Sequence, residues 1–187
     1  QVLQNAVNYA HEKGALVVAA VGNDGTRGVT YPARYEGVVG VTSVDAKGRQ
    51  SAFANYGEGV DIAAPGVDVY TAWSGDDLVS FSGTSSSAGF VSGALAAEIS
   101  RNPGMTSEQV VELLYDYANE AEKPGPDILT CKGILNVGRI ENRKVQGIQD
   151  AAVVGYYFDP EELKGGTTPF LVNVQNQGTA WLHGVSL

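Results

Sequence analysis

Short apolar segments rich in valine constrain the fold of this chain more than any other feature. Ala15–Val21 reads ALVVAAV, Val38–Val44 reads VVGVTSV and Val60–Ala64 reads VDIAA. Runs this short, without regular polar alternation, are typical of strands buried on both faces, as in a parallel sheet covered by helices. Two further segments, Val67–Trp73 and Leu78–Phe81, flank four turn residues and predict a hairpin.

Helical patterns alternate with these strands. Residues 1–13 carry one apolar stripe and end at Gly14, a common helix stop. A second helix is predicted from Thr84 to about Ser100, and its small first residues allow neighbouring backbone to pack closely. A third follows Thr106, which forms a capping box with Gln109. The alternation predicts an α/β fold, with a parallel sheet flanked by helices.

The pattern changes in the last quarter of the chain. The polar stretch 141–146 reads as a linker. Residues 151–158 and 170–174 read as strands, with a turn at 175–178 before a third strand. Strands without helices predict the start of an all-β, sandwich-like domain.

These patterns divide the chain into two parts. Residues 1–142 are expected to be part of an α/β domain, and residues 143–187 a linker with a truncated β-sandwich-like domain. The chain starts inside a helical pattern and stops inside a strand-like one. Both ends are therefore expected to lie within a longer protein.

Charge and composition exclude several classes of partner. The 12 basic and 21 acidic residues give a net charge of −9, with no Lys/Arg cluster to bind phosphates, so nucleic acid is not an expected partner. No apolar run approaches the roughly 18 residues that span a bilayer. The single cysteine, Cys131, excludes an internal disulfide and is interpreted as a small half-buried residue.

The first candidate for chemistry is Ser85. Gly83-Thr84-Ser85 is a glycine turn that delivers a serine to the start of a helix. Free N–H groups and the positive end of the helix dipole stabilise an anion there, such as the one formed when a serine attacks a carbonyl. A simple Thr or Ser helix cap explains the same residues equally well.

The second candidate is Asn23, in the turn Gly22-Asn23-Asp24-Gly25 that ends a buried strand. Sites in open parallel sheets lie at this end of the strands, and the Asn23 amide could donate a second hydrogen bond to an oxyanion. Taken alone, a turn asparagine tolerating an unusual backbone is the better explanation.

Together these motifs resemble a known family. The segments VVAAVGNDG, TYPARYEGVVGVTSVD, SAFANYGEGVDIAAPGVDVYTAWSG and FSGTSSSAGFVSGALA are similar in order and spacing to the subtilisin-like serine proteases (subtilases, peptidase S8). The resemblance covers about three-quarters of the chain, up to GILNV at 133–137. It implies that residues 1–142 are the C-terminal part of a subtilisin-like catalytic domain.

The resemblance also implies roles for individual residues. Ser85 matches the nucleophile and Asn23 the oxyanion-hole side chain, while Thr84 matches the threonine beside the nucleophile. The backbone of residues 20–22 (Ala20, Val21 and Gly22) matches one wall of the S1 pocket, and Thr30 lies near its floor. Tyr31-Pro32 matches a dipeptide that is cis in the family.

The activity implied is that of a secreted or cell-surface serine endopeptidase, a monomer acting on protein or peptide substrates through an acyl-enzyme. No cofactor is implied. Structural calcium occurs in the family, and a weak cation site borders this region in some relatives (Ala33, Tyr35, Val38 and Asp45), but no metal site is assigned here.

The chain departs from the family pattern in two ways. The aspartate and histidine motifs of the triad do not occur in it, and its two histidines, His11 and His183, are interpreted as surface or structural. These 187 residues are therefore expected to be an inactive fragment. After the nucleophile, Ser86, Gly89 and Phe90 replace a frequent methionine, proline and histidine, which leaves room for a degenerate enzyme.

Three other classes of protein are alternatives to a subtilisin-like protease. An α/β-hydrolase elbow needs G-x-S-x-G, whereas the chain reads G-T-S-S-S from Gly83. A dinucleotide site needs G-x-G-x-x-G after a strand, which residues 22–25 do not supply. A non-catalytic pseudoprotease, acting as a binding or adhesive module, stays open, although it would need neither Ser85 nor Asn23.

Overall fold

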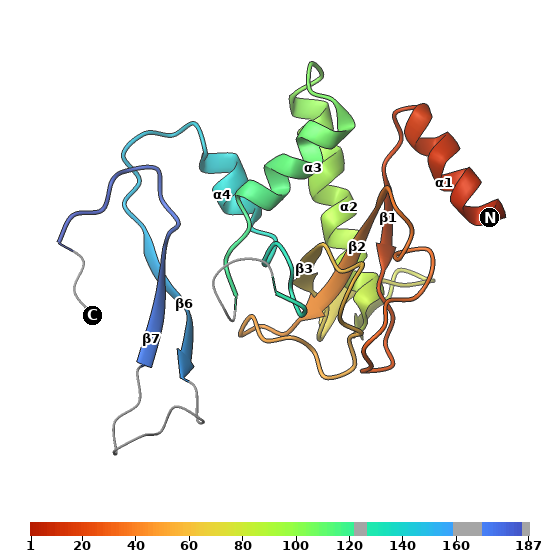
Figure 1. Ribbon diagram of the computed structural model, residues 1–187, viewed down its shortest axis with the longest axis horizontal. Helices are drawn as coiled ribbons and strands as arrows, with labels where there is room; N and C mark the ends of the chain where they lie inside the picture. Colours follow the sequence, from red (N-terminus) through yellow and green to blue (C-terminus); the bar gives the residue numbers. More distant parts are fainter. Residues whose placement is uncertain (122–126, 159–169, 185–187) are drawn as a thin grey trace.

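The computed structural model describes residues 1–121, 127–158 and 170–184 (Figure 1). Its helices are α1 (Val2–Glu12), α2 (Thr84–Arg101), α3 (Ser107–Asp116) and α4 (Val137–Asn142). Its strands are β1 (Val17–Ala20), β2 (Val38–Val44), β3 (Ile62–Pro65), β4 (Val69–Ala72), β5 (Leu78–Phe81), β6 (Ala151–Phe158) and β7 (Phe170–Asn176).

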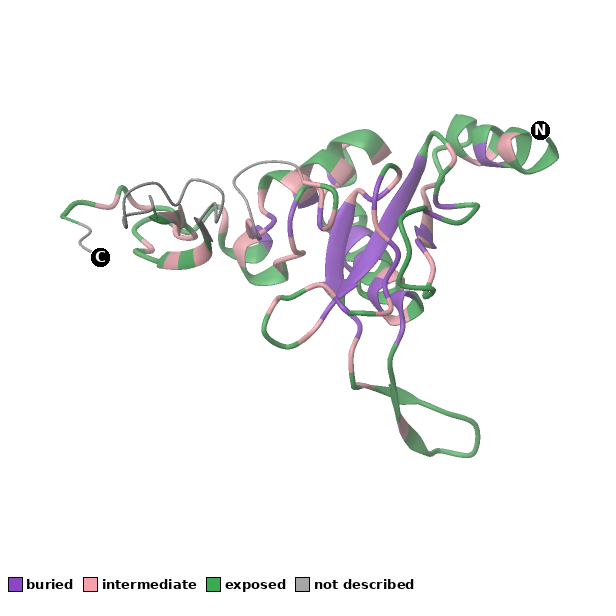
Figure 2. Ribbon diagram, turned by 60° about the horizontal axis from the view of Figure 1, so that its bottom comes forward, coloured by how far each residue is buried: buried purple, intermediate pink, exposed green. Residues whose placement is uncertain are grey.

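The three valine-rich segments form one parallel sheet in the order β1-β2-β3, as the sequence predicts. Val17 pairs with Val38, and Val41 pairs with Ile62. All seven residues of the central strand β2 are buried, which Figure 2 shows as the purple strands inside the molecule. A strand that is covered on both faces buries every side chain, so apolar residues need not alternate with polar ones, which explains the continuous apolar runs.

Two apolar clusters cover the two faces of this sheet. On one face, α2 packs across all three strands and α3 packs against α2. The cluster on that side comprises Val39, Val41, Ile62, Ala64, Val91, Ala94, Leu95, Val110, Leu114, Ala118 and Ile140. On the other face, Val7 of α1 and the segment 29–33 pack against Ala19 and Val38. The predicted α/β class is therefore confirmed.

Most of the predicted helix ends are also correct. Thr106 caps α3 and makes the full capping box with Gln109. Helix α4 was not predicted from the sequence. It is preceded by its cap residue Asn136, whose side chain accepts a hydrogen bond from the Arg139 N–H (2.9 Å). Since α4 runs to Asn142, the predicted linker 141–146 starts two residues too early.

A buried carboxylate joins α2 to the chain that follows α4. The Glu98 side chain is 3% exposed, and its Oε2 accepts hydrogen bonds from Arg143 Nη2 (2.7 Å) and Asn102 Nδ2 (3.0 Å). Its Oε1 accepts one from Arg101 Nη1 (3.1 Å). Arg143 Nη1 also donates to the carbonyl of Ile140.

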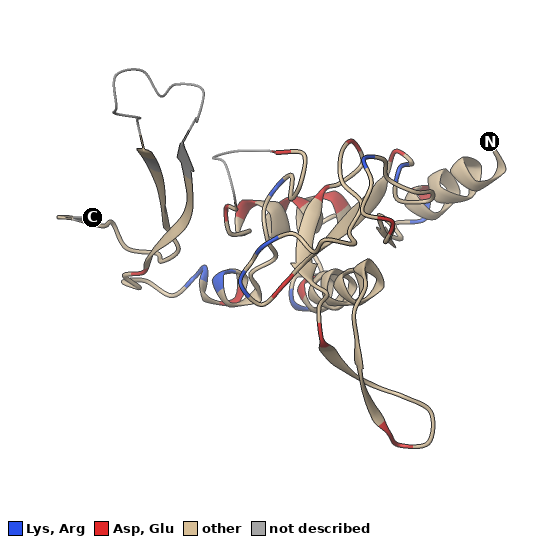
Figure 3. Cartoon of the chain, turned by 90° about the horizontal axis from the view of Figure 1, so that it is seen from below, with Lys and Arg blue, Asp and Glu red and all other residues tan. Residues whose placement is uncertain are grey.

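The segment predicted as a hairpin forms the antiparallel pair β4–β5, which projects from the body of the molecule (Figure 2). Its residues are mostly exposed, including Tyr70, Trp73 and Leu78. In Figure 3 the acidic residues of this part stand without basic neighbours, and Lys and Arg are scattered over the body rather than gathered on one face.

The C-terminal strands β6 and β7 form an antiparallel hairpin with a bulge between Val153 and Gly155. The sandwich expected here is not confirmed, and residues 177–184 contain no third strand. The predicted turn also starts too early, because β7 continues through Asn176. Gln175 ties the hairpin to the body: its side chain accepts from the Glu120 N–H (3.1 Å) and donates to the Ala118 carbonyl (3.2 Å).

Candidate active site

The N-terminus of α2 is held in place by a close backbone contact with the end of β3. The N–H of Gly83 donates to the Gly66 carbonyl (2.8 Å). Ser87 Oγ donates to the carbonyls of Ala64 (2.9 Å) and Pro65 (3.1 Å). A Cβ on Gly66 would lie only 2.4 Å from Ser87 Oγ, so the small residues seen in the sequence are required here.

Ser85 is the second residue of α2, and it is exposed at this helix end. Its N–H belongs to the first helical turn, where intrahelical partners are absent, and it donates to none of the residues that the structure describes. The serine thus combines an accessible hydroxyl with a free backbone donor.

Asn23 is clamped to the residue that precedes this serine, although the two are 61 positions apart in the chain. Its Oδ1 accepts hydrogen bonds from the Thr84 N–H (2.9 Å) and from Thr84 Oγ1 (2.9 Å). Thr84 itself is fully buried and Asn23 is exposed, so this contact lies at the edge of the protein interior. With Oδ1 occupied, Nδ2 faces away from Thr84 and donates to no residue in the described ranges.

The loop that carries Asn23 is organised by Asn55, a residue that the sequence analysis did not single out. The side chain of Asn55 accepts from the backbone of Asp24 (2.9 Å) and donates to the carbonyl of Gly28 (3.0 Å). No local signal marks this role, because the contacts cross about thirty residues of chain.

The residues expected to form one wall and the floor of the S1 pocket gather at the carboxyl end of β1. Val21 is fully buried, and its carbonyl accepts from both the N–H (3.0 Å) and the Oγ1 (3.2 Å) of Thr30. Gly22 follows with a left-handed φ of +112°, and Ala20 is half-buried. The bond between residues 31 and 32 is cis, as the resemblance implies.

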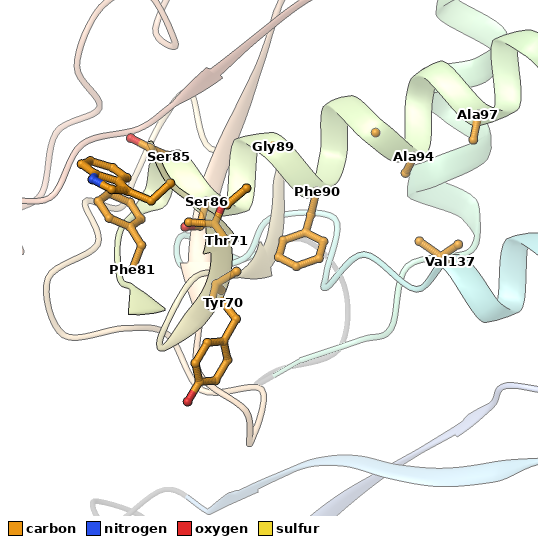
Figure 4. Close-up of a pocket in the computed structure, with 14 residues that line it drawn as sticks. Tyr70, Thr71, Phe81, Ser85, Ser86, Gly89, Phe90, Ala94, Ala97 and Val137 are labelled. Atoms are coloured by element: carbon orange, nitrogen blue, oxygen red, sulfur yellow. The ribbon is translucent and has the colours of Figure 1, made fainter. Parts of the chain in front are cut away.

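A second feature near Ser85 is an apolar groove of about 760 Å³ between α2 and the β4–β5 hairpin. Figure 4 shows Ser85 and Ser86 at one end beside Phe81, and Phe90 further along the helix. Tyr70 and Trp73 complete the aromatic lining. None of the residues expected in the S1 pocket lines this groove, and the sequence analysis assigned its aromatic residues no role.

The described part of the chain brings no histidine to Ser85. His11 pairs with Glu108 of α3 (Nε2 to Oε1, 2.9 Å), and His183 is exposed beyond β7. Within the described ranges, no three His, Cys, Asp or Glu side chains are grouped so that they could bind a metal ion. The helices in these ranges are too short or too polar to cross a membrane.

Fold and site together define a class of protein: an α/β protein with a parallel sheet, a serine at a helix N-terminus and an asparagine amide clamped beside it. The chain belongs to the subtilase family, since the model of that family matches residues 1–149.

Curated relatives are proteases. The chain is 40% identical over 137 residues to a thermostable alkaline protease from Halalkalibacterium halodurans, covering 73% of this chain and 37% of the relative. It is 38% identical over 134 residues to subtilisin BL from Lederbergia lenta, covering 72% of this chain and 49% of the relative. The chain therefore spans half or less of the length of these relatives.

Solved structures agree with the fold. The epidermin leader peptide processing serine protease from Staphylococcus aureus matches with a TM-score of 0.71 and 29% identity, over 78% of this chain and 44% of that one. The prenylagaramide maturation protease matches with a TM-score of 0.66 and 30% identity, over 72% and 52%. The subtilisin-like architecture predicted from the sequence is thus confirmed.

Proposed function

We propose that these 187 residues carry the nucleophile and the oxyanion hole of a serine endopeptidase, in which Ser85 forms the acyl-enzyme. The triad histidine and aspartate would come from residues outside this sequence, which contains neither of the family motifs for them. In that protein a histidine takes the proton of Ser85 Oγ as the oxygen attacks the scissile carbonyl, and an aspartate orients the histidine.

The oxyanion would be bound by two donors. As the carbonyl carbon becomes tetrahedral, its oxygen gains negative charge, and the Ser85 N–H and Asn23 Nδ2 donate to it. The positive end of the α2 dipole stabilises the same charge. Donors held rigidly before the reaction need no reorganisation when the charge develops.

The observation that carries this proposal is the pair of hydrogen bonds from Thr84 to Asn23 Oδ1. They fix which end of the amide points away from Thr84, and so leave Nδ2 as the free donor. A helix cap needs no such clamp, and neither does a turn asparagine. The clamp therefore favours an oxyanion hole over both of those explanations.

Substrates and setting belong to the same proposal. Family membership supports protein or peptide substrates, and we expect one pocket wall from residues 20–22, with Thr30 near the floor favouring moderate or small apolar P1 side chains. We also propose a monomer that acts outside the cell or at its surface. Secretion assays on the full-length protein and its mass in solution would test these two points.

The decisive experiment is labelling with a fluorophosphonate, which reacts with activated serines. We expect the 187-residue chain to remain unlabelled and the full-length protein to be labelled, with Ser85→Ala in the full-length protein as the control. Labelling of the short chain would show that another group activates Ser85. A full-length protein that folds but is not labelled would instead indicate a pseudoprotease that acts by binding.

A further inference from the structure

Asn55 lies in the chain between β2 and β3 and is 1% exposed. All its polar groups are engaged, and most of its hydrogen bonds go to one place, the loop 22–28 that carries Asn23. A buried amide with so many partners in one distant loop holds that loop in a single conformation.

The Asn55 side chain supplies hydrogen bonds to the backbone of the loop 22–28, which has no regular secondary structure. Asn55 Oδ1 accepts from the backbone N–H of Asp24 (2.9 Å) and, more weakly, of Thr26 (3.3 Å). Asn55 Nδ2 donates to the carbonyl of Gly28 (3.0 Å), with a longer contact to the Asp24 carboxylate (3.4 Å). Backbone groups at three points of the loop are therefore bound by one amide.

The backbone of Asn55 extends the clamp to the other side of Asn23. Its N–H donates to the carbonyl of Gly22 (3.0 Å), while its own carbonyl accepts from Thr42 Oγ1 on the buried strand β2 (3.2 Å). Both neighbours of Asn23 are thus bound to Asn55, and Asn55 is bound to the sheet.

Gly22 is shaped to receive this side chain. A Cβ built on Gly22 would lie 2.4 Å from Asn55 Nδ2, so any larger residue would displace the amide. Gly22 also has a φ of +112°, which residues with a side chain rarely adopt. The glycine and the asparagine therefore fit as a pair.

We propose that Asn55 is a positioning residue for catalysis: it holds the loop 22–28 so that the Asn23 amide meets the oxyanion at Ser85. The inference rests on the proposed function. Thr84 binds the Asn23 side chain by hydrogen bonds, and Asn55 binds the backbone of the residues on either side of Asn23. An oxyanion donor is effective only within about 2.7–3.1 Å of the developing charge, so both anchors are needed.

The test uses Asn55→Ala and Asn55→Asp in the full-length protein. Asn55→Asp keeps the acceptor oxygen but places a carboxylate oxygen, in place of the Nδ2 donor, against the Gly28 carbonyl and the Asp24 carboxylate. Active serines are titrated with a fluorophosphonate, and kcat is expressed per titrated serine so that unfolded molecules are not counted. We expect kcat to fall by about 10- to 100-fold for Asn55→Ala and at least as much for Asn55→Asp, because its buried carboxylate would repel the oxygens of Gly28 and Asp24, while KM changes by less than about threefold.

A double-mutant cycle separates positioning from general stability. If Asn55 acts through Asn23, adding Asn55→Ala to Asn23→Ala should reduce kcat by less than about threefold more. The matched control is Asn136→Ala, which removes a helix cap and the hydrogen bond to Asn119 Oδ1 (2.9 Å). We expect it to lower thermal stability and leave kcat per titrated serine unchanged.

Each outcome has one meaning. Normal kcat per titrated serine in the Asn55 variants, or full additivity with Asn23→Ala, would overturn the positioning role and leave the protease proposal intact. Absence of labelling and hydrolysis in the folded wild-type protein would refute the proposed function itself.

Discussion

The replacement Arg143→Met tests the buried ion pair between Arg143 and Glu98. Glu98 is 3% exposed and Arg143 12%, so the pair is shielded from water. Removing one partner of such a pair costs about 3–5 kcal/mol, because the other charge stays buried. Glu98 keeps its hydrogen bonds from Arg101 and Asn102, which places the expected loss at the lower end, about 3 kcal/mol.

The assay is thermal unfolding followed by circular dichroism at pH 7 and moderate ionic strength. For a chain of 187 residues, 1 kcal/mol shifts Tm by about 2–4 °C, so Arg143→Met should lower Tm by about 6–12 °C. The control Arg101→Met removes a side chain that is 51% exposed, and it should lower Tm far less.

The charge itself can be tested by adding Glu98→Gln to Arg143→Met. A neutral amide in place of the carboxylate should restore more than half of the lost Tm, because it removes a buried charge that would otherwise be paired by the half-exposed Arg101 alone. High salt should weaken only the Arg101 effect, since buried pairs are screened less. Equal losses for the two arginine variants, or no recovery in the double variant, would refute this reasoning.

Three further outcomes are expected. Gly66→Ala should destabilise the protein by about 1–3 kcal/mol in urea unfolding, because its Cβ would meet two serine hydroxyls 2.4 Å away. Gly93→Ala should stabilise the 187-residue chain by up to about 1 kcal/mol, because a Cβ at this helical position would have nothing within 4 Å. With Ser86 in place of the family's frequent methionine, the full-length enzyme should keep its activity after peroxide treatment, and rapid inactivation would contradict this. Burial and the Asp61 carboxylate raise the pKa of the Cys131 thiol, so less thiolate is present at pH 8 and iodoacetamide should react with Cys131 more slowly than with a cysteine peptide. Asp61→Asn should lower the pKa of the thiol and speed this reaction. An unchanged rate in that variant would exclude an influence of the carboxylate.

Much of the fold could be read from local pattern. The capping box at Thr106, the stop at Gly14 and the buried strand 38–44 depend on neighbouring residues and on the burial of whole segments. The short helix α4 was missed because six residues carry too little periodicity to stand out. The start of a β-sandwich expected for residues 143–187 is not confirmed, since two paired strands specify a hairpin and not its partner sheet.

The candidate site also has features that the sequence predicted and features that it did not. Ser85 and Asn23 were chosen from motifs, and their roles remain a proposal, but the clamp from Thr84 to Asn23 could not be deduced from either motif. The aromatic groove was missed because Trp73 and Phe81 look like ordinary hairpin residues. The Thr84–Asn23 contact and the groove both depend on how segments far apart in the sequence pack against one another.

By itself, the sequence determined the parallel α/β class, the helix that starts before Ser85 and the likeness to subtilases. The signals for these features are the spacing of apolar residues, the helix caps and the turn glycines, and each of them acts over a few neighbouring residues. The tertiary structure alone decided that Thr84 and Asn55 hold the loop of Asn23 from two sides. Those hydrogen bonds join residues 61 and 31 positions apart, and they exist only after the sheet has packed against α2.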